Sequence, residues 1–362
     1  MRVLISGDHF IKNELVEERL VSALGKLGGL EFIHHGNDWP HVPFEFNDEI
    51  QEYVGDSAEI SRLAEDADII VAHMAPIDRR VIETARRLKA IAVARGGPVN
   101  VNVKAATERS VPVLFVPGRN ARAVAEYTVA LLLAQAKRIV EAHVDLARNV
   151  WRTELYTFDG AGWELDGRTV GLIGFGHIGR LVADMLAPFG VKIFVYDPYV
   201  RVTDPRVTQV SLEELLQTAD FVSLHARVTP ETTHLINART LAMMKPSAHL
   251  INTARGPLVD YDALVEALQK GVIAGAALDT FHLEPLPADH PLTRLPNVTL
   301  TPHVAGSSKQ VVWRAIDRLA EDLRRLFTGL RPWHCINPEV LEADQRERAR
   351  HADAGREARR GE

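Results

Sequence analysis

Three segments in the second half of the chain place polar side chains directly after apolar runs. They are INTARGPLVD (251–260), AALDTFHLEP (276–285) and TLTPHVAG (299–306). The carboxyl ends of parallel strands meet at one edge of a sheet, where ligands bind. Arg255, Glu284 and His303 would supply there an anion-binding guanidinium, a carboxylate and a proton carrier that works near neutral pH. Such a set suits proton transfer to or from an anionic substrate.

Each of these residues also has an ordinary explanation. Arg255 could be a helix-capping or surface charge, Glu284 could lie in a solvated turn before Pro285, and His303 could be a loop histidine with satisfied hydrogen bonds. Their joint appearance at three consecutive strand ends favours a site. A carboxylate beside a histidine orients the imidazole and favours its charged form.

A glycine motif precedes these segments. VGLIGFGHIGR (170–180) fits GxGxxG at Gly174, Gly176 and Gly179, between a predicted strand and a predicted helix. The first glycine would allow a tight turn, the second would let the backbone approach a pyrophosphate, and the third would let helix and strand pack closely. The amino end of the helix would then offer free N–H groups to the phosphates. The alternative is a glycine-rich turn that binds nothing.

Asp197 ends the next predicted strand, 18 residues after Gly179. That spacing is close to the ~20 residues expected for the acid that binds ribose hydroxyls. A carboxylate there would repel the additional phosphate of NADP, and Pro198 and Tyr199 follow it rather than an arginine. The motif therefore predicts a dinucleotide site that favours NAD over NADP.

Short β-branched runs alternate with helical patterns along most of the chain, which indicates parallel strands covered by helices. The fold class predicted is α/β, with two doubly wound parallel-sheet domains. We expect strands at 3–5, 31–34, 69–72, 90–94, 112–116, 169–173, 191–196, 221–224, 249–252, 274–278 and 298–301, and helices at 13–27, 177–189, 212–218, 238–244, 261–270 and 308–327.

Three stretches interrupt this rhythm. Residues 36–55 hold two prolines and several aromatics (Trp39, Phe44, Phe46, Tyr53) and are interpreted as a long loop, which either shapes specificity or packs on the surface. A nearly all-apolar helix from Ala121 is expected to be buried between domains or subunits. Residues 341–362 are polar with balanced charges and are predicted to be a disordered tail.

Composition excludes several classes of protein. The net charge of −6 argues against a general nucleic-acid binder. One cysteine, Cys335, rules out an intrachain disulfide and a cysteine zinc cluster, and no metal site is predicted. No apolar stretch approaches the ~18 residues of a membrane span. The N-terminus lacks the apolar core of a signal peptide. We expect a cytoplasmic protein that binds neither nucleic acid nor membrane.

Taken together, the segments VGLIGFGHIGR, INTARGPLVD, ALDTFHLEP and TPHVAG resemble the D-isomer-specific 2-hydroxyacid dehydrogenase family, as does PGRNARAVAEYTVALLL (117–133). The resemblance covers roughly residues 50–335. It implies that Arg255 binds the substrate, that His303 is the acid/base with Glu284 as its partner, and that Asp279 holds the nicotinamide carboxamide. The cofactor-binding set implied is Gly174, Gly176, His177, Ile178, Gly179, Asp197, His225, Thr253, Ala254, Asp279 and His303.

The resemblance also implies an organisation. Residues 1–118 with 307–340 would form a flavodoxin-like substrate domain, and residues 119–306 a Rossmann NAD-binding domain, with the active site in a cleft between them. A homodimer built largely from the NAD domains is implied. The helix from Ala121 and the loop at 151–163 are the predicted dimer surface.

The sequence departs from the family pattern at three positions in two segments. In ARGGPVNVNV (94–103), Val99 stands where relatives carry Asp, and Arg95 is an added cation. The expected substrate-binding set is Arg95, Gly96, Gly97, Asn100, Arg255 and His303. Arg95 would either clamp a phosphate, phosphonate or second carboxylate or simply pair with a neighbouring acid. Arg227, where relatives carry proline, would lie near the adenosine side of the cofactor.

The leading hypothesis is therefore an oxidoreductase that moves hydride between NAD(H) and a small D-2-hydroxy acid or 2-oxo acid, which could bear a second anionic group. One rival is a non-enzymatic NAD(H)-responsive binding protein, like the corepressor relatives on this fold. A second is a formate dehydrogenase, whose family pattern pairs the histidine with Gln. The complete Arg255, Glu284 and His303 set favours the first hypothesis over both rivals.

Overall fold

The structure, a computed structural model, describes residues 1–342. It divides into two compact units: Met1–Arg119 together with the chain from Ser308 onward, and Asn120–Ser307. The tail predicted at 341–362 falls outside the described residues except for Leu341 and Glu342, and Leu341 is buried. The two units are described separately below as unit 1 and unit 2.

Unit 1 contains a five-stranded parallel sheet in the order β2-β1-β3-β4-β5. Its strands are β1 (Arg2–Gly7), β2 (Glu31–Gly36), β3 (Ile69–Ala72), β4 (Ala90–Val93) and β5 (Val113–Leu114). This order is the flavodoxin-like one, in which the chain direction across the sheet reverses between β1 and β3. The carboxyl ends of those two strands are therefore adjacent.

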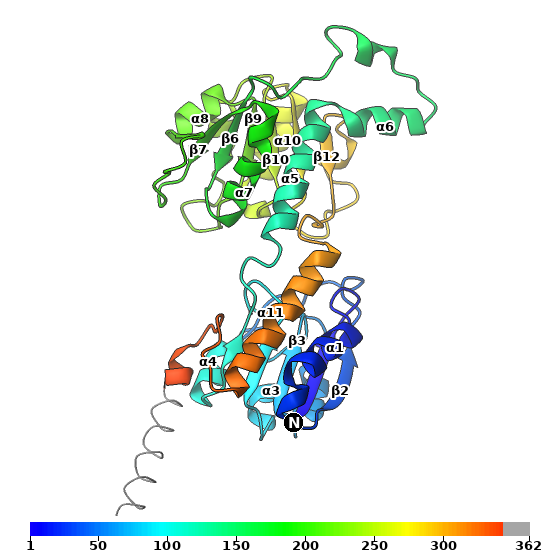
Figure 1. Ribbon diagram of the computed structural model, residues 1–362. Helices are drawn as coiled ribbons and strands as arrows, with labels where there is room; N and C mark the ends of the chain where they lie inside the picture. The colour runs from blue at the N-terminus through cyan, green and yellow to red at the C-terminus, as the bar shows by residue number, and fades with distance from the viewer. Residues whose placement is uncertain (343–362) are drawn as a thin grey trace, which may run out of the picture. The chain divides into compact units, whose positions relative to one another are not determined.

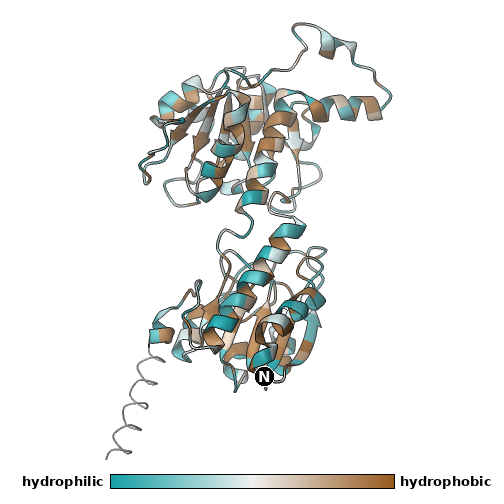
Figure 2. Ribbon diagram, viewed as in Figure 1, coloured by the Kyte–Doolittle hydropathy of each residue, from teal (hydrophilic) through white to brown (hydrophobic). Residues whose placement is uncertain are grey.

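Helices cover both faces of this sheet (Figure 1). They are α1 (Asn13–Leu24), η1 (Gly25–Leu27), α2 (Ser57–Ala64), α3 (Arg79–Thr84), α4 (Val103–Glu108) and α11 (Lys309–Phe327). Alternate strand residues point to opposite faces, so Val3 and Ile5 pack with α1 and α11, whereas Leu4 packs with α2 and α3. Figure 2 shows these strands largely in hydrophobic colours, as expected for a sheet buried on both faces.

Unit 2 contains a seven-stranded parallel sheet in the order β12-β11-β10-β9-β6-β7-β8. Its strands are β6 (Thr169–Ile173), β7 (Lys192–Tyr196), β8 (Val207–Gln209), β9 (Phe221–Leu224), β10 (His249–Asn252), β11 (Gly275–Leu278) and β12 (Val298–Leu300). This is the Rossmann order with one added strand, and the order reverses between β6 and β9. Both predicted domain folds are confirmed.

The helices of unit 2 also lie on two faces. They are α5 (Ala121–Ala136), α6 (Ile139–Ala147), η2 (Thr153–Tyr156), α7 (His177–Leu186), η3 (Ala187–Phe189), α8 (Leu212–Thr218), α9 (Ala238–Leu241), η4 (Gly256–Leu258), α10 (Tyr261–Gln269) and η5 (Pro291–Arg294). One face packs against α5 and α7 and the other against α8 and α10. Both faces of the sheet are therefore occupied.

The structure corrects the sequence analysis in two places. The apolar helix from Ala121 is not continuous, because Arg138 adopts a left-handed conformation (φ 53°) that separates α5 from α6. The buried side of α5 packs on the sheet of its own unit. The expected burial of this helix between domains or subunits stays a prediction. Strand β8 was not predicted, since VTQ is short and polar. Within residues 1–342, no helix is both long and apolar enough to span a membrane.

Candidate active site

The glycine loop between β6 and α7 has the geometry its sequence predicts. Gly174 has φ 97°, and a Cβ there would lie 2.7 Å from the backbone of His225. A Cβ on Gly179 would lie 2.4 Å from Gly174 O, whereas a Cβ on Gly176 would meet no described atom within 4 Å. Gly176 is the N-cap residue of α7 and makes no side-chain cap hydrogen bond, and His177 and Ile178 lie in the first turn of the helix. The amino end of this helix therefore suits an anionic group.

Asp197 lies beside this loop at the end of β7. Its Oδ2 accepts a hydrogen bond from Phe175 N at 2.8 Å, and its Oδ1 accepts from Tyr199 N at 2.9 Å and Val200 N at 3.1 Å. These bonds fix the carboxylate against the glycine loop and leave further lone pairs for hydroxyl donors. Its expected bond to ribose hydroxyls stays a prediction.

The remaining predicted cofactor residues lie at neighbouring strand ends. His225 follows β9, donates its backbone N–H to Ile173 O at 2.7 Å, and has its pKa lowered to about 4 by burial. Thr253 follows β10 and bonds to Thr128 of α5 at 2.7 Å. Ala254 N donates to Asn252 Oδ1 at 3.0 Å. All three belong to the carboxyl edge of the sheet that carries the glycine loop.

His303 and Glu284 form a hydrogen-bonded pair. His303 Nδ1 is 2.7 Å from Glu284 Oε2, and their side chains are 45% and 35% exposed. Burial would raise the pKa of Glu284, but hydrogen bonds from His303 and Phe281 N, with the charge of Arg255, hold it below the ordinary value. Because an ionised carboxylate only accepts, Nδ1 carries the proton and Nε2 is the nitrogen directed elsewhere.

Asp279 holds the backbone that carries His303. It is fully buried, its Oδ1 accepts from Thr301 Oγ1 at 2.6 Å and Val304 N at 3.0 Å, and its Oδ2 accepts from Ala305 N at 2.8 Å. His303 itself has φ 54°, a conformation that costs free energy and persists only where the surroundings impose it. The contacts of Asp279 supply that constraint. Its predicted bond to a carboxamide stays a prediction.

Arg255 is an exposed residue in the turn after β10. Its Nη1 donates to Ala254 O at 2.8 Å, and the next residue, Gly256, lies against the segment that leads to Glu284. A Cβ on Gly256 would lie 1.9 Å from Phe281 O, so only glycine permits this approach. Arg255 is near enough for its charge to lower the pKa of Glu284. The structure therefore brings the three predicted catalytic residues together on unit 2.

The predicted substrate loop of unit 1 follows β4. Gly96 and Gly97 are exposed, whereas Asn100 is buried and donates to His73 O at 3.1 Å and Ala75 O at 2.8 Å. Arg95 forms an ion pair with Glu52 and also donates to Glu52 O at 2.7 Å. The second interpretation of Arg95, pairing with a neighbouring acid, is thus the one observed.

The sequence analysis missed a buried cluster next to this loop. His73 Nδ1 lies 2.6 Å from Asp8 Oδ2, and His73 Nε2 lies 3.1 Å from Arg119 Nη2. Asp8 follows β1 and His73 follows β3, at the reversal point of the sheet. The rule that identified Arg255 and His303, polar residues after apolar strands, would have found Asp8 and His73 had it been applied to the first half.

The remaining candidates have contacts of their own. Arg227 is exposed, and its carbonyl accepts from Thr232 Oγ1 at 2.6 Å. Trp313 packs beneath Arg19 of α1, whose guanidinium carbon lies 4.8 Å from its ring centre. Trp39 and Phe44 stack with ring centres 6.3 Å apart, and Trp39 also meets the His73 ring edge-on at 5.2 Å. The 36–55 loop thus contacts the cluster in unit 1.

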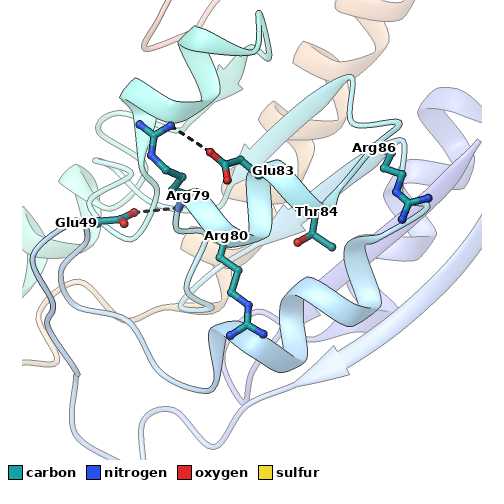
Figure 3. A pocket seen from close by; sticks show the side chains of 6 residues that line it. All are labelled: Glu49, Arg79, Arg80, Glu83, Thr84 and Arg86. Carbon is teal, nitrogen blue, oxygen red and sulfur yellow. Dashed lines mark hydrogen bonds and ion pairs between the residues drawn. The ribbon is translucent and has the colours of Figure 1, made fainter.

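A shallow pocket on unit 1 contains none of the predicted residues (Figure 3). Its lining consists of charged side chains and one threonine: Glu49, Arg79, Arg80, Glu83, Thr84 and Arg86. Arg79 N donates to Glu49 at 3.0 Å, and Arg79 Nη1 donates to Glu108 at 2.8 Å. The bond between Arg79 and Glu108 is an exposed ion pair of the kind that contributes little free energy. Residues 1–342 contain no cluster of three or more His, Cys, Asp or Glu side chains arranged for a metal ion.

Comparison with known proteins gives consistent matches. Residues 129–305 match the family model described as D-isomer specific 2-hydroxyacid dehydrogenase, NAD binding domain. A glyoxylate reductase of Thermofilum pendens is 39% identical over 314 residues, which is 85% of this chain and 88% of that protein. A D-3-phosphoglycerate dehydrogenase of Mycobacterium leprae is 38% identical over 278 residues, or 76% of this chain but 52% of that protein.

Solved structures agree with these matches. An NAD-dependent formate dehydrogenase from Staphylococcus aureus, solved in complex with NAD, is 31% identical with a TM-score of 0.75. The alignment covers 93% of this chain and 98% of that one. The likeness therefore extends over both units and includes a relative with the dinucleotide bound.

Proposed function

The chain belongs to the D-isomer specific 2-hydroxyacid dehydrogenase family and is an NAD-dependent dehydrogenase acting on a CH–OH group, and from that premise we propose that Arg255, Glu284 and His303 are its catalytic residues. The substrate in this proposal is a small D-2-hydroxy acid or the matching 2-oxo acid. The observation that carries the proposal is the 2.7 Å bond between His303 and Glu284 at the sheet edge that also bears the glycine loop.

The glycine loop fits the cofactor. Open space at Gly176 and the uncapped amino end of α7 suit a pyrophosphate, and Asp197 suits the hydroxyls of a ribose. His177, Ile178, Gly179, His225, Thr253 and Ala254 line the same edge. When bound, NADH supplies the hydride that reduces a carbonyl carbon.

His303 supplies the proton in this proposal. Its Nδ1–H is engaged by Glu284, so Nε2 is the atom that donates to the carbonyl oxygen during reduction and accepts the proton during oxidation. Glu284 orients the ring and stabilises the imidazolium. Asp279 acts through the loop it holds and is a positioning residue.

Arg255 binds the substrate's carboxylate and stabilises the negative charge that develops on the carbonyl oxygen. Its exposed guanidinium has only a backbone carbonyl as hydrogen-bond partner among residues 1–342, so most of its donors remain for an anion. The role expected for Gly96 and Gly97, exposed in the loop after β4 of unit 1, as backbone N–H donors to a substrate carboxylate stays a separate prediction. The guanidinium of Arg255 suits an anionic 2-oxo acid.

A spectrophotometric assay tests the proposal. The full-length protein is mixed with NADH and a panel of 2-oxo acids, including glyoxylate, hydroxypyruvate and 3-phosphohydroxypyruvate, and absorbance is followed at 340 nm. We expect oxidation of NADH with at least one acid. Tight NADH binding without turnover on the whole panel would instead indicate a non-enzymatic NAD(H)-responsive protein.

The proposal includes a homodimer, in the cytoplasm where the sequence analysis expects the protein. Exposed apolar side chains gather on α6 and the segment after it: Trp151, Tyr156 and Phe158 are 78%, 98% and 96% exposed. Apolar surface of this extent commonly marks an interface. Light scattering on the wild type and on a Trp151→Ser, Phe158→Ser variant should give a dimer and a monomer, respectively. A monomeric wild type would refute the dimer.

A further inference from the structure

A buried tyrosine of unit 2 lies beside the segment that leads to Glu284. Tyr261 is the first residue of α10 and is 4% exposed, and its ring centre lies 4.8 Å from that of His282 and 6.2 Å from that of Phe281. Its hydroxyl donates to the backbone carbonyl of Thr280. The hydroxyl is therefore bound to the peptide group that joins Thr280 to Phe281.

The same peptide group binds Glu284 through its other end. Phe281 N donates to Glu284 Oε1 at 2.9 Å, and Glu284 Oε2 lies 2.7 Å from His303 Nδ1. A trans peptide is planar and its C=O and N–H point in opposite directions, so a bond that fixes one of them orients the other. One chain of hydrogen bonds thus runs from the tyrosine hydroxyl through the peptide and the carboxylate to the imidazole.

The orientation of this peptide depends on Tyr261 rather than on the side chain of Thr280. Thr280 is buried, but within residues 1–342 its Oγ1 has no hydrogen-bond partner. Burial raises the pKa of the Tyr261 hydroxyl, the side chain of Asn252 acts in the opposite direction, and the negative charge of Glu284 raises the pKa further. The phenol therefore keeps its proton at ordinary pH and acts as a donor.

The turn that carries Arg255 has hydrogen bonds of its own. Asn252 Oδ1 accepts from Ala254 N at 3.0 Å, and Asn252 Nδ2 donates to Arg255 O at 3.0 Å. Neither bond involves the Tyr261 hydroxyl. Loss of that hydroxyl should therefore disturb Glu284 and leave the position of Arg255 nearly unchanged.

We propose that Tyr261 is a positioning residue of the dehydrogenase reaction, which acts through the peptide that it binds to hold the Glu284 carboxylate against His303. This inference rests on the proposed function, in which Glu284 and His303 are catalytic. Each hydrogen bond in a chain polarises the next, so the hydroxyl also strengthens the donation by Phe281 N. With Glu284 held in place, Nδ1 of His303 keeps its proton and Nε2 is the atom that transfers one.

Steady-state kinetics of a Tyr261→Phe variant test the proposal, because this exchange removes the hydroxyl and keeps the ring. With NADH and the preferred 2-oxo acid, we expect kcat to fall about 3- to 10-fold, the loss of one hydrogen bond, and KM to change by less than about 2-fold. Tyr127→Phe makes the same exchange at a partly buried tyrosine of α5 and should leave both constants unchanged. An unchanged kcat in Tyr261→Phe, or an equal fall in Tyr127→Phe, would overturn the inference.

A double-mutant cycle separates positioning from a loss of packing. If Tyr261 acts through Glu284, adding Tyr261→Phe to Glu284→Gln should lower kcat by less than about 2-fold, because the carboxylate that the tyrosine holds is already absent. Two independent effects would instead multiply. The same fold-loss in both backgrounds would therefore refute the inference.

A spectroscopic measurement tests the inference without turnover. The ¹⁵N chemical shifts of a neutral imidazole report which nitrogen carries the proton, and comparison with His303→Gln identifies the signals of His303. In the cofactor-free wild type we expect the Nδ1–H form, and Tyr261→Phe should raise the fraction of the Nε2–H form. An unchanged fraction refutes the role of Tyr261 even if the enzyme is active. If the wild type oxidises NADH with none of the acids, the dehydrogenase proposal fails, and a raised fraction still supports the chain of hydrogen bonds.

Discussion

Residues 1–342 hold an arginine–histidine–carboxylate group in each unit, and the histidine–carboxylate distance is nearly the same in both. His303 and Glu284 are 2.7 Å apart and 45% and 35% exposed, whereas His73 and Asp8 are 2.6 Å apart and both fully buried as side chains. Arg255 neighbours the first pair and Arg119 the second. Because the two histidine–carboxylate distances are nearly equal, a difference in chemistry between the pairs must come from their surroundings.

The two histidines differ in the surroundings of their second ring nitrogen, Nε2. His73 Nε2 accepts from Arg119, and burial, with the charges of Arg119 and Arg95, lowers the pKa of His73 to about 4 although Asp8 raises it. This ring therefore stays neutral at ordinary pH and orients an arginine. Among residues 1–342 no bond involves His303 Nε2, so that atom can exchange a proton. A histidine–carboxylate pair is thus a candidate acid/base only where its other nitrogen is accessible.

Loss of Arg255 should have the largest effect. In Arg255→Gln we expect kcat/KM for a 2-oxo acid to fall about 1000-fold, because substrate binding and charge stabilisation both depend on this guanidinium. The free energy of unfolding should barely change, since the side chain is exposed. Assay at 340 nm and thermal unfolding check both. A fall below 10-fold would remove Arg255 from the catalytic set.

Loss of Glu284 should have a smaller effect on the rate. In Glu284→Gln we expect kcat to fall about 10- to 100-fold, since the ring loses the carboxylate that stabilises its charged form. The pKa of Glu284 lies below its ordinary value, so in the wild type the pair persists below pH 4.5 and is lost only as the pH falls through that lowered pKa. The matched exchange Asp8→Asn should reduce the melting temperature rather than kcat. A fall in kcat in Asp8→Asn, together with a lower melting temperature and normal kcat in Glu284→Gln, would exchange the roles of the two pairs.

The smallest expected effect is on the pH dependence of the free energy of unfolding. A histidine with a pKa of about 4 in the folded state and 6.5 when unfolded contributes stability above pH 6.5 that declines as the pH falls toward 4. When the pH falls from 6.5 to 5.5, the free energy of unfolding of the wild type should decrease by about 1 kcal/mol more than that of His73→Gln. Urea unfolding at the two pH values measures this. Equal losses would mean that His73 is not held neutral.

Much of the fold could be predicted from the sequence, because period-2 and period-3.6 patterns and glycine turns act locally. All five strands of unit 1 and six of the seven strands of unit 2 were expected. The exception is β8, which is short and polar. The break at Arg138 was missed because no glycine or proline marks it. The burial of α5 against its own sheet was missed because an apolar face does not reveal its partner.

The site in unit 2 could be predicted because its residues follow three consecutive strands next to a glycine motif. Arg119 could not, since nothing in PGRNAR indicates that its side chain reaches a histidine 46 positions earlier. Arg95 carried two interpretations because its counter-ion, Glu52, lies in a loop without periodicity. Contacts between distant, irregular segments depend on the folded backbone rather than on local pattern.

One comparison, between the His303→Gln and His73→Gln enzymes, tests the central claim most directly. Turnover of NADH and the preferred 2-oxo acid is followed at 340 nm, and NADH binding is measured by fluorescence. We predict that His303→Gln loses at least 100-fold in kcat while still binding NADH. His73→Gln should keep kcat within a few-fold. Normal turnover by His303→Gln, or a larger kcat loss in His73→Gln, would contradict the assignment of proton transfer to the exposed pair.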